Sequence, residues 1–349
     1  MAFFRRKTFC KMSLNTTVAA ALSVFLLVTV SRRLLRTWDE KIYGADTNPS
    51  LPIYVLILSS IPRSGSTFLA EMLSSLEDSV LFFEPLWPLE RGQCIQDDAC
   101  VEKFLLGVFG CNFTGQFEDW LRSKPTFLRY FNPEASQCDR LEGREKDQCF
   151  RSLPLRETCS NSTVRLVKVV RARMHSFSKV MADPEVNFKL VHLTRDPRGA
   201  MESISHFAGW DKDPAERCRG LEEDLDTYEV FSDRYPSKVF RVSYERLCLY
   251  PLQEVSKILG FVFDVPPFVP PPVEAYINDH TKVMKGKESL STYKVSEREY
   301  FAWRWRISEG LLKSVEGEPT CLRPIQRLQH TVFGSLERVR NVSLQLFAP

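Results

Sequence analysis

The feature that most constrains the fold is an apolar strand-like run followed by a small-residue turn and a helix-like stretch. The run covers residues 53–58, the turn begins at Arg63 and contains Gly65, and the helix-like stretch begins at Phe68. In such a segment, free backbone N–H groups and the positive end of the helix dipole converge on one anion. The turn lacks the Lys-Ser or Lys-Thr ending of the nucleotide triphosphatase loop. It therefore predicts a phosphate site and argues against a kinase or a triphosphatase.

Strand-like and helix-like segments alternate along most of the chain. Strands are expected at residues 53–60, 80–83, 164–170, 188–194 and 238–242. Helices are expected at residues 67–76, 174–181, 199–206 and 221–231, and in a C-terminal part that includes residues 297–315. Several strands are continuous runs of Val, Leu and Ile, which are typical of parallel strands buried on both faces. The pattern predicts an α/β fold, a single domain with a central, mostly parallel sheet flanked by helices and a P-loop-like nucleotide site.

The N-terminal segment predicts a transmembrane signal anchor. Residues 12–30 are largely apolar, close to the ~20 residues that span a bilayer as a helix. Four basic residues precede this segment and three follow it, so the flanking charge indicates the orientation only weakly. A cleaved signal peptide is the alternative, but no A-x-A-like site follows the apolar run. We expect a cytosolic tail at residues 1–11, the anchor at 12–30, a stem at 31–52 and a luminal domain at 53–349.

The cysteines favour a luminal location for the body of the chain. Nine of the ten follow the predicted anchor, and six of these lie between residues 94 and 159 without the C-x-x-C spacing of a zinc site. This predicts disulfides in an oxidising lumen, within an insertion at about residues 91–160; buried thiols in a cytosolic protein are the alternative. The odd count leaves a thiol free or paired between chains, so a homodimer is one expected arrangement. N-x-[ST] triplets at Asn112, Asn161 and Asn341 are weaker signs of the lumen.

A second anion site is predicted where another strand-like run ends at Arg195. Asp196 is suited to cap the following helix and Pro197 to occupy its first turn. Arg195 then lies at the carboxyl end of a strand, where open α/β sheets bind ligands. Ser203 follows about two helical turns later on roughly the same face, and an arginine fork with a hydroxyl suits a phosphate. The alternative is an ion pair of Arg195 with Asp196 or Glu202 on a solvated surface.

Together these segments resemble the sulfotransferase family, and in particular its Golgi membrane-bound carbohydrate branch. The first resembles the family's loop for the 5′-phosphosulfate of the donor, 3′-phosphoadenosine 5′-phosphosulfate (PAPS). The second, with Arg195 and Ser203, resembles its 3′-phosphate site. The residues of the loop are Arg63, Ser64, Gly65, Ser66, Thr67 and Phe68. The resemblance implies that PAPS is the co-substrate.

Three further motifs carry the resemblance, which runs from about residue 53 to about residue 330. Residues 82–87 look like the F-E-P-L-W of enzymes that sulfate the 6-hydroxyl of galactose, N-acetylglucosamine or N-acetylgalactosamine. Residues 242–247 are similar to a V-x-Y-E-D-L element, with Arg246 where Asp is common, and residues 302–306 match a C-terminal W-R segment. The resemblance implies a glycan acceptor, in a glycoprotein or a glycosaminoglycan, and a single-pass type II enzyme of the Golgi membrane.

Two residues are predicted to be catalytic, Arg63 and Glu84. Sulfuryl transfer passes in line from a phosphate oxygen to a sugar hydroxyl, so the protein mainly positions the partners and neutralises charge on the leaving group. Arg63 stands where several relatives carry a Lys, and we expect it to stabilise the bridging and 5′-phosphate oxygens. Backbone N–H groups from Ser64 to Thr67 should hold the donor. No metal is expected, because the transferred group carries less charge than a phosphoryl group.

Glu84 is the predicted general base for the acceptor hydroxyl. Its sequence neighbours are apolar, a setting that makes a carboxylate more basic, and relatives place a catalytic Glu at this point. The alternative is a Glu that pairs with an Arg and holds the loop. Among the histidines, His192 falls in a predicted buried strand, whereas His206 is close enough to Ser203 to line the site.

Other interpretations stay open. A non-catalytic, membrane-anchored glycan-binding protein on the same scaffold is disfavoured by the intact Arg63, Glu84 and Arg195. A protein-tyrosine sulfotransferase is disfavoured by the F-E-P-L-W resemblance. Lys168, Arg171 and Arg173 are expected either to face the donor phosphates or a polyanionic acceptor, or to form a solvated basic surface. The formal net charge of +3 gives no reason to expect nucleic acid as a partner.

Overall fold

The computed structural model describes residues 51–349, apart from residues 90–91, 132–134, 139, 283–290 and 348–349. The predicted tail, the predicted anchor and nearly all of the predicted stem therefore lie outside the described residues. Within the described part, none of the helices combines the length and the apolar character that a membrane crossing needs.

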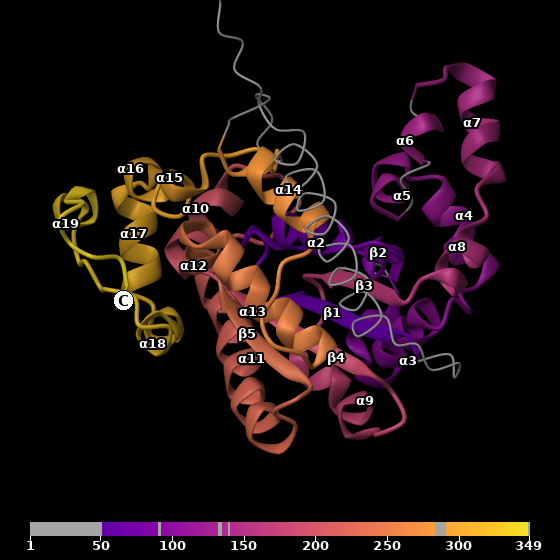
Figure 1. Cartoon of the computed structure of the whole chain (residues 1–349). Coiled ribbons are helices and arrows are strands. Elements are labelled where there is room, and N and C mark those ends of the chain that lie inside the picture. Colours follow the sequence, from indigo (N-terminus) through magenta and orange to yellow (C-terminus); the bar gives the residue numbers. More distant parts are fainter. Residues whose placement is uncertain (1–50, 90–91, 132–134, 139, 283–290, 348–349) are drawn as a thin grey trace, which may run out of the picture. The chain divides into compact units, whose positions relative to one another are not determined.

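Among the described residues, five parallel strands form the centre of the fold, in the order β2-β3-β1-β4-β5 (Figure 1). They are β1 (Ile53–Ser59), β2 (Ser79–Phe83), β3 (Val164–Val169), β4 (Phe188–Thr194) and β5 (Val239–Ser243). Each lies within one residue of its predicted bounds, because parallel strands buried on both faces appear as continuous apolar runs. The predicted α/β fold with a parallel sheet is confirmed.

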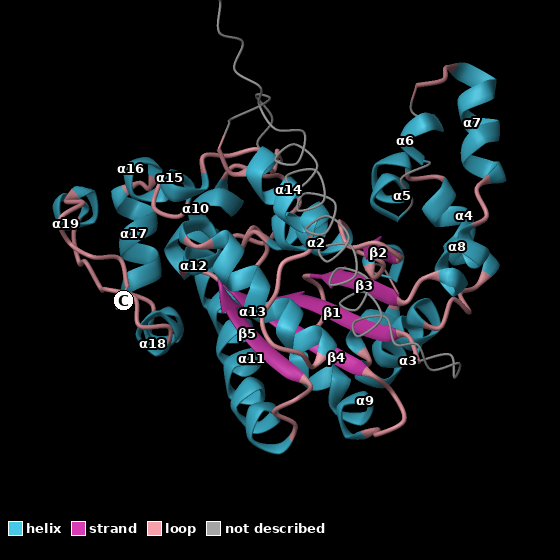
Figure 2. Ribbon diagram, viewed as in Figure 1, coloured by secondary structure: helices cyan, strands magenta, loops and turns pink. Residues whose placement is uncertain are grey.

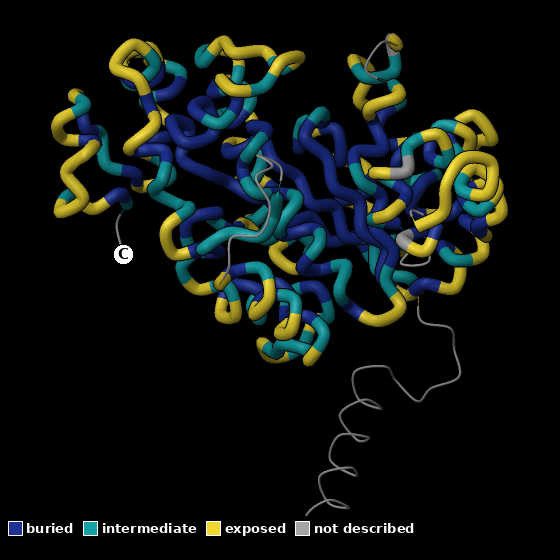
Figure 3. The backbone as a smooth tube through the Cα atoms, turned by 90° about the horizontal axis from the view of Figure 1, so that it is seen from above, coloured by how far each residue is buried: buried dark blue, intermediate teal, exposed yellow. Residues whose placement is uncertain are grey.

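Helices cover both faces of this sheet (Figure 2). On β1, Val55 and Ile57 face one helical layer and Leu56 and Leu58 face the other, because successive side chains of a strand point to opposite faces. The first layer consists of α2 (Ser66–Ser74), α12 (Tyr244–Leu249), α13 (Pro251–Phe263) and α14 (Pro271–His280). The second contains α3 (Asp98–Phe109), the short helices η3 (Met174–Phe177) and α9 (Ser178–Ala182), and α11 (Pro214–Arg234). The strands consequently lie in the buried interior (Figure 3).

The Cys-rich segment between β2 and β3 is helical and carries three disulfides. Its elements are η1 (Trp87–Leu89), η2 (Gln93–Gln96), α3, α4 (Gly115–Arg122), α5 (Pro125–Phe131), α6 (Ala135–Cys138), α7 (Gly143–Ser152) and α8 (Leu155–Asn161). The disulfides are Cys94–Cys100, Cys111–Cys159 and Cys138–Cys149. The predicted stapling of this insertion by its six cysteines is confirmed. Because α3 packs on the sheet, the insertion shares the core of the main fold.

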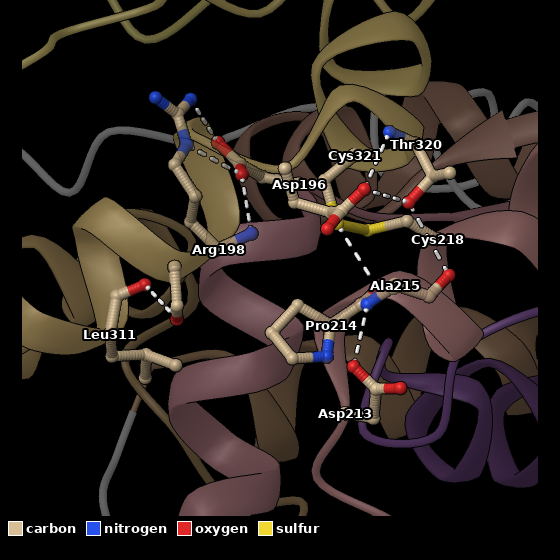
Figure 4. Close-up of a disulfide and its surroundings, with 11 residues drawn as sticks. Asp196, Arg198, Asp213, Pro214, Ala215, Cys218, Leu311, Thr320 and Cys321 are labelled. Atoms are coloured by element: carbon tan, nitrogen blue, oxygen red, sulfur yellow. Dashed lines mark hydrogen bonds and ion pairs between the residues drawn. A yellow bond between two sulfur atoms is a disulfide. The ribbon is translucent and has the colours of Figure 1, made fainter.

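Short helices make up the C-terminal part, which packs against α10 (Pro197–Ser205). They are α15 (Ser296–Glu299), α16 (Trp303–Arg306), α17 (Glu309–Glu316), α18 (Pro319–Arg327) and α19 (Leu336–Arg340). The predicted helical stretch at residues 297–315 is thus divided among three helices. A fourth disulfide, Cys218–Cys321, fastens α11 to α18 (Figure 4).

Among the described residues, Cys248 is the free cysteine, and its thiol is buried. Burial raises the pKa of this thiol to about 12, so it stays protonated. In this fold the buried thiol cannot form a disulfide with a second chain. The predicted homodimer therefore has no support from this cysteine and stays a prediction.

Candidate functional site

A cavity of about 590 Å3 opens at the carboxyl edge of the sheet. Its lining includes residues from the segments that follow all five strands, the usual place for a ligand in an open α/β sheet. The predicted site residues in this lining are Arg63, Gly65, Ser66, Thr67, Phe68, Glu84, Arg195 and Ser203. The structure thus brings together, around one cavity, residues that are far apart in the sequence.

The small-residue turn adopts the geometry of an anion loop. Gly65 is the residue before α2 and has a φ of 88°, in the left-handed region that favours glycine. A Cβ at this position would lie 2.4 Å from the ring of Tyr244, so a larger residue is excluded by contact as well as by conformation. The first N–H groups of α2, which have no acceptor within the helix, begin directly after this glycine. Ser64 is the one residue of the predicted loop that is absent from the described lining of the cavity. Its hydroxyl is buried and donates to the carbonyl of Ile61 at 2.7 Å.

Arg63 connects the two predicted phosphate segments. Its Nε donates to the hydroxyl of Ser203 at 3.3 Å, and its guanidinium lies over the ring of Phe207, 4.4 Å from the centroid. Burial lowers the pKa of Arg63, and the neighbouring charge of Arg195 lowers it further. Two arginines held this close repel each other, which favours an anion between or beside them.

Arg195 lies where it was predicted, at the end of β4. One of its terminal nitrogens donates to the backbone carbonyl of Arg63 at 2.5 Å, and its guanidinium lies 4.4 Å from the ring centroid of Tyr244. The alternative ion pair with Asp196 is wrong, since Asp196 binds Arg198 instead (Figure 4). The two predicted anion segments are therefore in direct contact.

Asp196 caps the N-terminus of α10. Its carboxylate accepts from the backbone N–H of Arg198 at 2.9 Å, with Pro197 in the first turn, which confirms both predictions for this helix. Burial by itself would raise the pKa of Asp196, but Arg198 and His330 lower it to about 2. The cap is thus a buried, ionised group that fixes the position of the preceding Arg195.

Glu84 does not have the apolar surroundings that its sequence neighbours suggested. Its buried carboxylate is bound by Lys168, which belongs to β3, and by Arg171, which follows that strand. Each cation is backed by an aromatic ring: Lys168 lies 4.4 Å from the centroid of Phe83, and Arg171 lies 4.6 Å from that of Trp210. Burial lowers the pKa of Lys168, and Glu84 opposes that effect. The expectation of a solvated basic surface is therefore wrong for Lys168.

Neither His192 nor His206 lines the cavity in the described structure. The ring of His192 is fully buried and bonds to the hydroxyl of Ser60 at 2.8 Å, as expected of a core histidine. His206 pairs with Glu202 at 2.8 Å and is absent from the described lining of the cavity, so the prediction that it lines the site is wrong.

Several lining residues were not predicted from the sequence. Phe207 and Trp210 come from the connection between α10 and α11, and Thr126, Phe127 and Tyr130 come from the insertion. His280 of α14 and, further along the chain, Lys294 and Arg306 also line the cavity. Apart from Arg306, which ends the W-R segment at residues 302–306, no motif marks these positions, because each reaches the cavity only through tertiary packing. Among the described residues, no group of three or more His, Cys, Asp or Glu side chains is placed to hold a metal ion.

Comparison with known proteins identifies the family of the chain. Residues 55–299 match the sulfotransferase domain family. Because the match covers most of the chain, the protein belongs to the sulfotransferase family, whose members are enzymes. Its curated relatives confirm the predicted resemblance to the carbohydrate sulfotransferases.

Two of these relatives show the extent of the similarity. Human carbohydrate sulfotransferase 5 is 23% identical over 342 residues, which cover 85% of this chain and 82% of the relative. Mouse carbohydrate sulfotransferase 3 is 25% identical over 309 residues, which cover 75% of this chain and 65% of the relative.

Solved structures give more distant matches. A sulfotransferase domain from the curacin biosynthetic pathway has 15% identity and a TM-score of 0.43, over 81% of this chain and 99% of that one. Mouse sulfotransferase SULT7A1 complexed with PAP has 12% identity and a TM-score of 0.34, over 85% and 86% of the two chains.

Proposed function

We propose that this enzyme transfers a sulfuryl group from PAPS to a sugar hydroxyl, the 6-hydroxyl by resemblance, in a glycoprotein glycan or a glycosaminoglycan. The observation that carries the proposal is the meeting of the two predicted phosphate segments and Glu84 around one cavity. The names of the curated relatives support a sugar as the acceptor.

The donor would lie across the segments that follow β1 and β4. The start of α2 offers backbone N–H groups to the 5′-phosphosulfate, while Arg195 and Ser203 offer donors to the 3′-phosphate. Arg63 lies between them and is suited to stabilise charge on the bridging oxygen as the bond to sulfur breaks. Its partly buried position strengthens such an electrostatic effect.

Glu84 is proposed to accept the proton of the acceptor hydroxyl. It lines the cavity at the end of β2, next to the segments assigned to the donor. Because Lys168 and Arg171 already bind the carboxylate, the proton would move to an ion-paired group. The alternative, a carboxylate that only holds the loop, uses the same two contacts, so an experiment must separate the two roles.

The test measures transfer of labelled sulfate from PAPS by the full-length chain, to a panel of glycans and a tyrosine peptide. We expect transfer to a glycan, with Arg63→Ala lowering turnover by roughly 100-fold or more while donor affinity changes less. Glu84→Gln should lower turnover by roughly 100-fold or more and leave donor affinity near that of the wild type. Glu309→Gln, at an exposed Glu–Lys pair outside the cavity lining, is the matched control.

Other outcomes assign other roles. A marked loss of thermal stability in Glu84→Gln, with turnover little changed, would identify Glu84 as a loop-holding residue. Donor binding without transfer to any acceptor would favour the glycan-binding protein, and transfer to the peptide alone would favour tyrosine sulfation. Normal turnover in Arg63→Ala would refute its role at the leaving group.

We also propose a Golgi location, with the described domain in the lumen and an N-terminal membrane anchor. The four disulfides suit an oxidising compartment. The three sequon asparagines, Asn112, Asn161 and Asn341, are exposed, as acceptors for a glycan must be. A shift in electrophoretic mobility after glycosidase treatment of the expressed chain would test the luminal orientation.

A further inference from the structure

Side chains hold the backbone that leads into the proposed donor loop, residues 63–68. The carbonyl of Ile61 accepts from the hydroxyls of Ser59 at 2.9 Å and Ser64 at 2.7 Å. These two contacts are local. The carbonyl of Ser60 instead accepts, at 3.0 Å, from the guanidinium of Arg173, which is 113 residues away in the sequence. A distant side chain thus fixes the residue that directly follows β1.

Arg173 reaches Ser60 from outside the cavity. It follows β3 and is absent from the described lining, so any effect on a donor passes through other residues. Its second terminal nitrogen forms an ion pair at 3.0 Å with Asp224 of α11. Asp224 is fully buried and also accepts from the backbone N–H of Met174 at 2.7 Å. Because an unpaired buried charge is costly, Asp224 holds the guanidinium in place.

A glycine of α11 makes room for this guanidinium. A Cβ at Gly220 would lie 2.3 Å from a terminal nitrogen of Arg173 and 3.1 Å from its Cζ. Gly220 is helical and its φ is not positive, so the backbone itself does not require glycine there. Glycine is less favourable than alanine inside a helix. Two residues earlier, Cys218 joins α11 to α18 by a disulfide (Figure 4). The notch at Gly220 therefore belongs to a helix that is fixed to its neighbours.

Ser60 is held on both of its polar groups. Its hydroxyl bonds to the buried ring of His192 at 2.8 Å, and its carbonyl bonds to Arg173. Arg63, with its left-handed φ of 67°, follows only three residues later. Backbone N–H groups bind an anion strongly only where they converge on it. A misplacement of about 1 Å in a positioning element can cost roughly 100-fold in rate.

We propose that Arg173 is a positioning residue for the donor loop: from the notch at Gly220 it fixes the carbonyl of Ser60 and thereby aims the N–H groups of the loop at the 5′-phosphosulfate. The inference rests on the proposed function, because it takes PAPS as the ligand of the loop. Arg173 acts through Ser60 and touches no reacting atom. The missing side chain of Gly220 serves donor affinity in this device, at the expense of helix stability.

The test measures equilibrium binding of labelled PAP, which PAPS becomes when it loses its sulfuryl group, and thermal unfolding of the full-length chain. Gly220→Ala is the decisive variant, because it removes no polar group and favours the helix, yet displaces the guanidinium. We expect its Kd for PAP to rise by roughly 10-fold while its Tm is unchanged or higher. Gly310→Ala, the same change in α17 with nothing within 4 Å, is the matched control and should leave the Kd unchanged.

Variants of Arg173 complete the test. Arg173→Ala should raise the Kd for PAP by roughly 10-fold or more and lower the Tm, since Asp224 is left buried without its cation. Arg173→Lys keeps the charge and should restore part of the affinity. Combining Gly220→Ala with Arg173→Ala should weaken binding no further than Arg173→Ala alone, because no guanidinium remains to be displaced.

Three results would overturn the inference: wild-type affinity for PAP in Gly220→Ala, additive losses in the combined variant, or a Tm of Gly220→Ala as low as that of Arg173→Ala. The last would give Gly220 a role in folding alone. Binding of PAP by the wild type without transfer to any acceptor would refute the proposed function and leave this inference intact. If the wild type does not bind PAP, the donor site itself fails, and this is seen before any variant is compared.

Discussion

Arg63 and Glu84 share an uncommon backbone conformation. Their φ angles are 67° and 51°, in the left-handed region where non-glycine residues are rare. Each follows a strand, so the unusual angle turns the chain sharply at the carboxyl edge of the sheet, and both residues line the cavity. Such a conformation costs roughly 1–3 kcal/mol and persists where the surroundings hold it. For Glu84 these surroundings include its two cations.

Gly65→Ala tests the anion loop at the scale of one residue. The new Cβ would meet Tyr244 at 2.4 Å in a left-handed conformation, so we expect donor affinity to fall by roughly 10-fold or more as the loop shifts. Gly310→Ala is the control, because nothing lies within 4 Å of its Cβ position in α17. That change should instead stabilise the helix by about 0.5–1 kcal/mol. Donor titration and thermal unfolding check both, and tight donor binding by Gly65→Ala would contradict the loop assignment.

Residue motifs predicted the geometry of the proposed donor segments better than the surroundings of Glu84. Gly65 and Arg195 lie in short segments whose function depends on local geometry, and the sequence shows that geometry directly. Glu84 was identified as a candidate, but its partner Lys168 is 84 residues away. That pairing depends on the register of β2 against β3, in which Phe83 lies beside Lys168. Apolar runs do not specify such a register.

At the scale of elements, strands were predicted closely and the insertion was not. The strands are buried on both faces, so their apolar runs end where the strands end. Helices α4 and α7 are amphipathic, have few buried residues and lie in a segment held by disulfides. Short helices of this kind depend on tertiary contacts, which a single sequence does not display.

The Cys218–Cys321 disulfide is expected to stabilise the fold more than the Cys94–Cys100 disulfide. The first closes a loop of 103 residues between α11 and α18, and the second closes a loop of 6 residues. Chain-entropy estimates give about 4–5 kcal/mol for the longer loop and about 2 kcal/mol for the shorter. Replacing each pair by alanines and comparing denaturant unfolding tests the order. A larger loss from the Cys94–Cys100 pair would show that loop entropy does not control these contributions.

At the scale of the whole molecule, the fold class followed from the alternation of strands and helices, but the strand order did not. The chain places β1 between β3 and β4, although its neighbour in sequence is β2. The pattern of apolar runs contains no information on which strands pair. The cavity depends on that order, since it gathers the ends of β1, β2, β3 and β4 at one edge.

The stability of the whole fold should fall in mild acid because of His192. Burial lowers the pKa of this histidine from 6.5 to about 3, and the charges of Arg241 and Arg173 add to the effect. Below pH 6.5 the unfolded chain therefore takes up a proton that the folded chain does not. Stability decreases as the pH falls from the unfolded value toward the folded one, by about 2 kcal/mol at about pH 5.

Urea unfolding at about pH 7.5 and about pH 5 tests this contribution. His192→Gln should reduce the difference in unfolding free energy between the two conditions. Equal pH dependence in His192→Gln and the wild type would contradict the assignment.

The position of β1 at the centre of the sheet also bears on how the chain assembles. Ile53 pairs with Val164 of β3, and Tyr54 pairs with Phe188 of β4. The pairing of β1 is therefore complete only after these two strands, which are synthesised much later, have emerged. The insertion disulfides close loops of 6, 48 and 11 residues before β3 begins. Short loops close faster than long ones. During synthesis, the insertion can thus be cross-linked while the sheet is still open, so the residues that it contributes to the cavity would be positioned before the segment that follows β4.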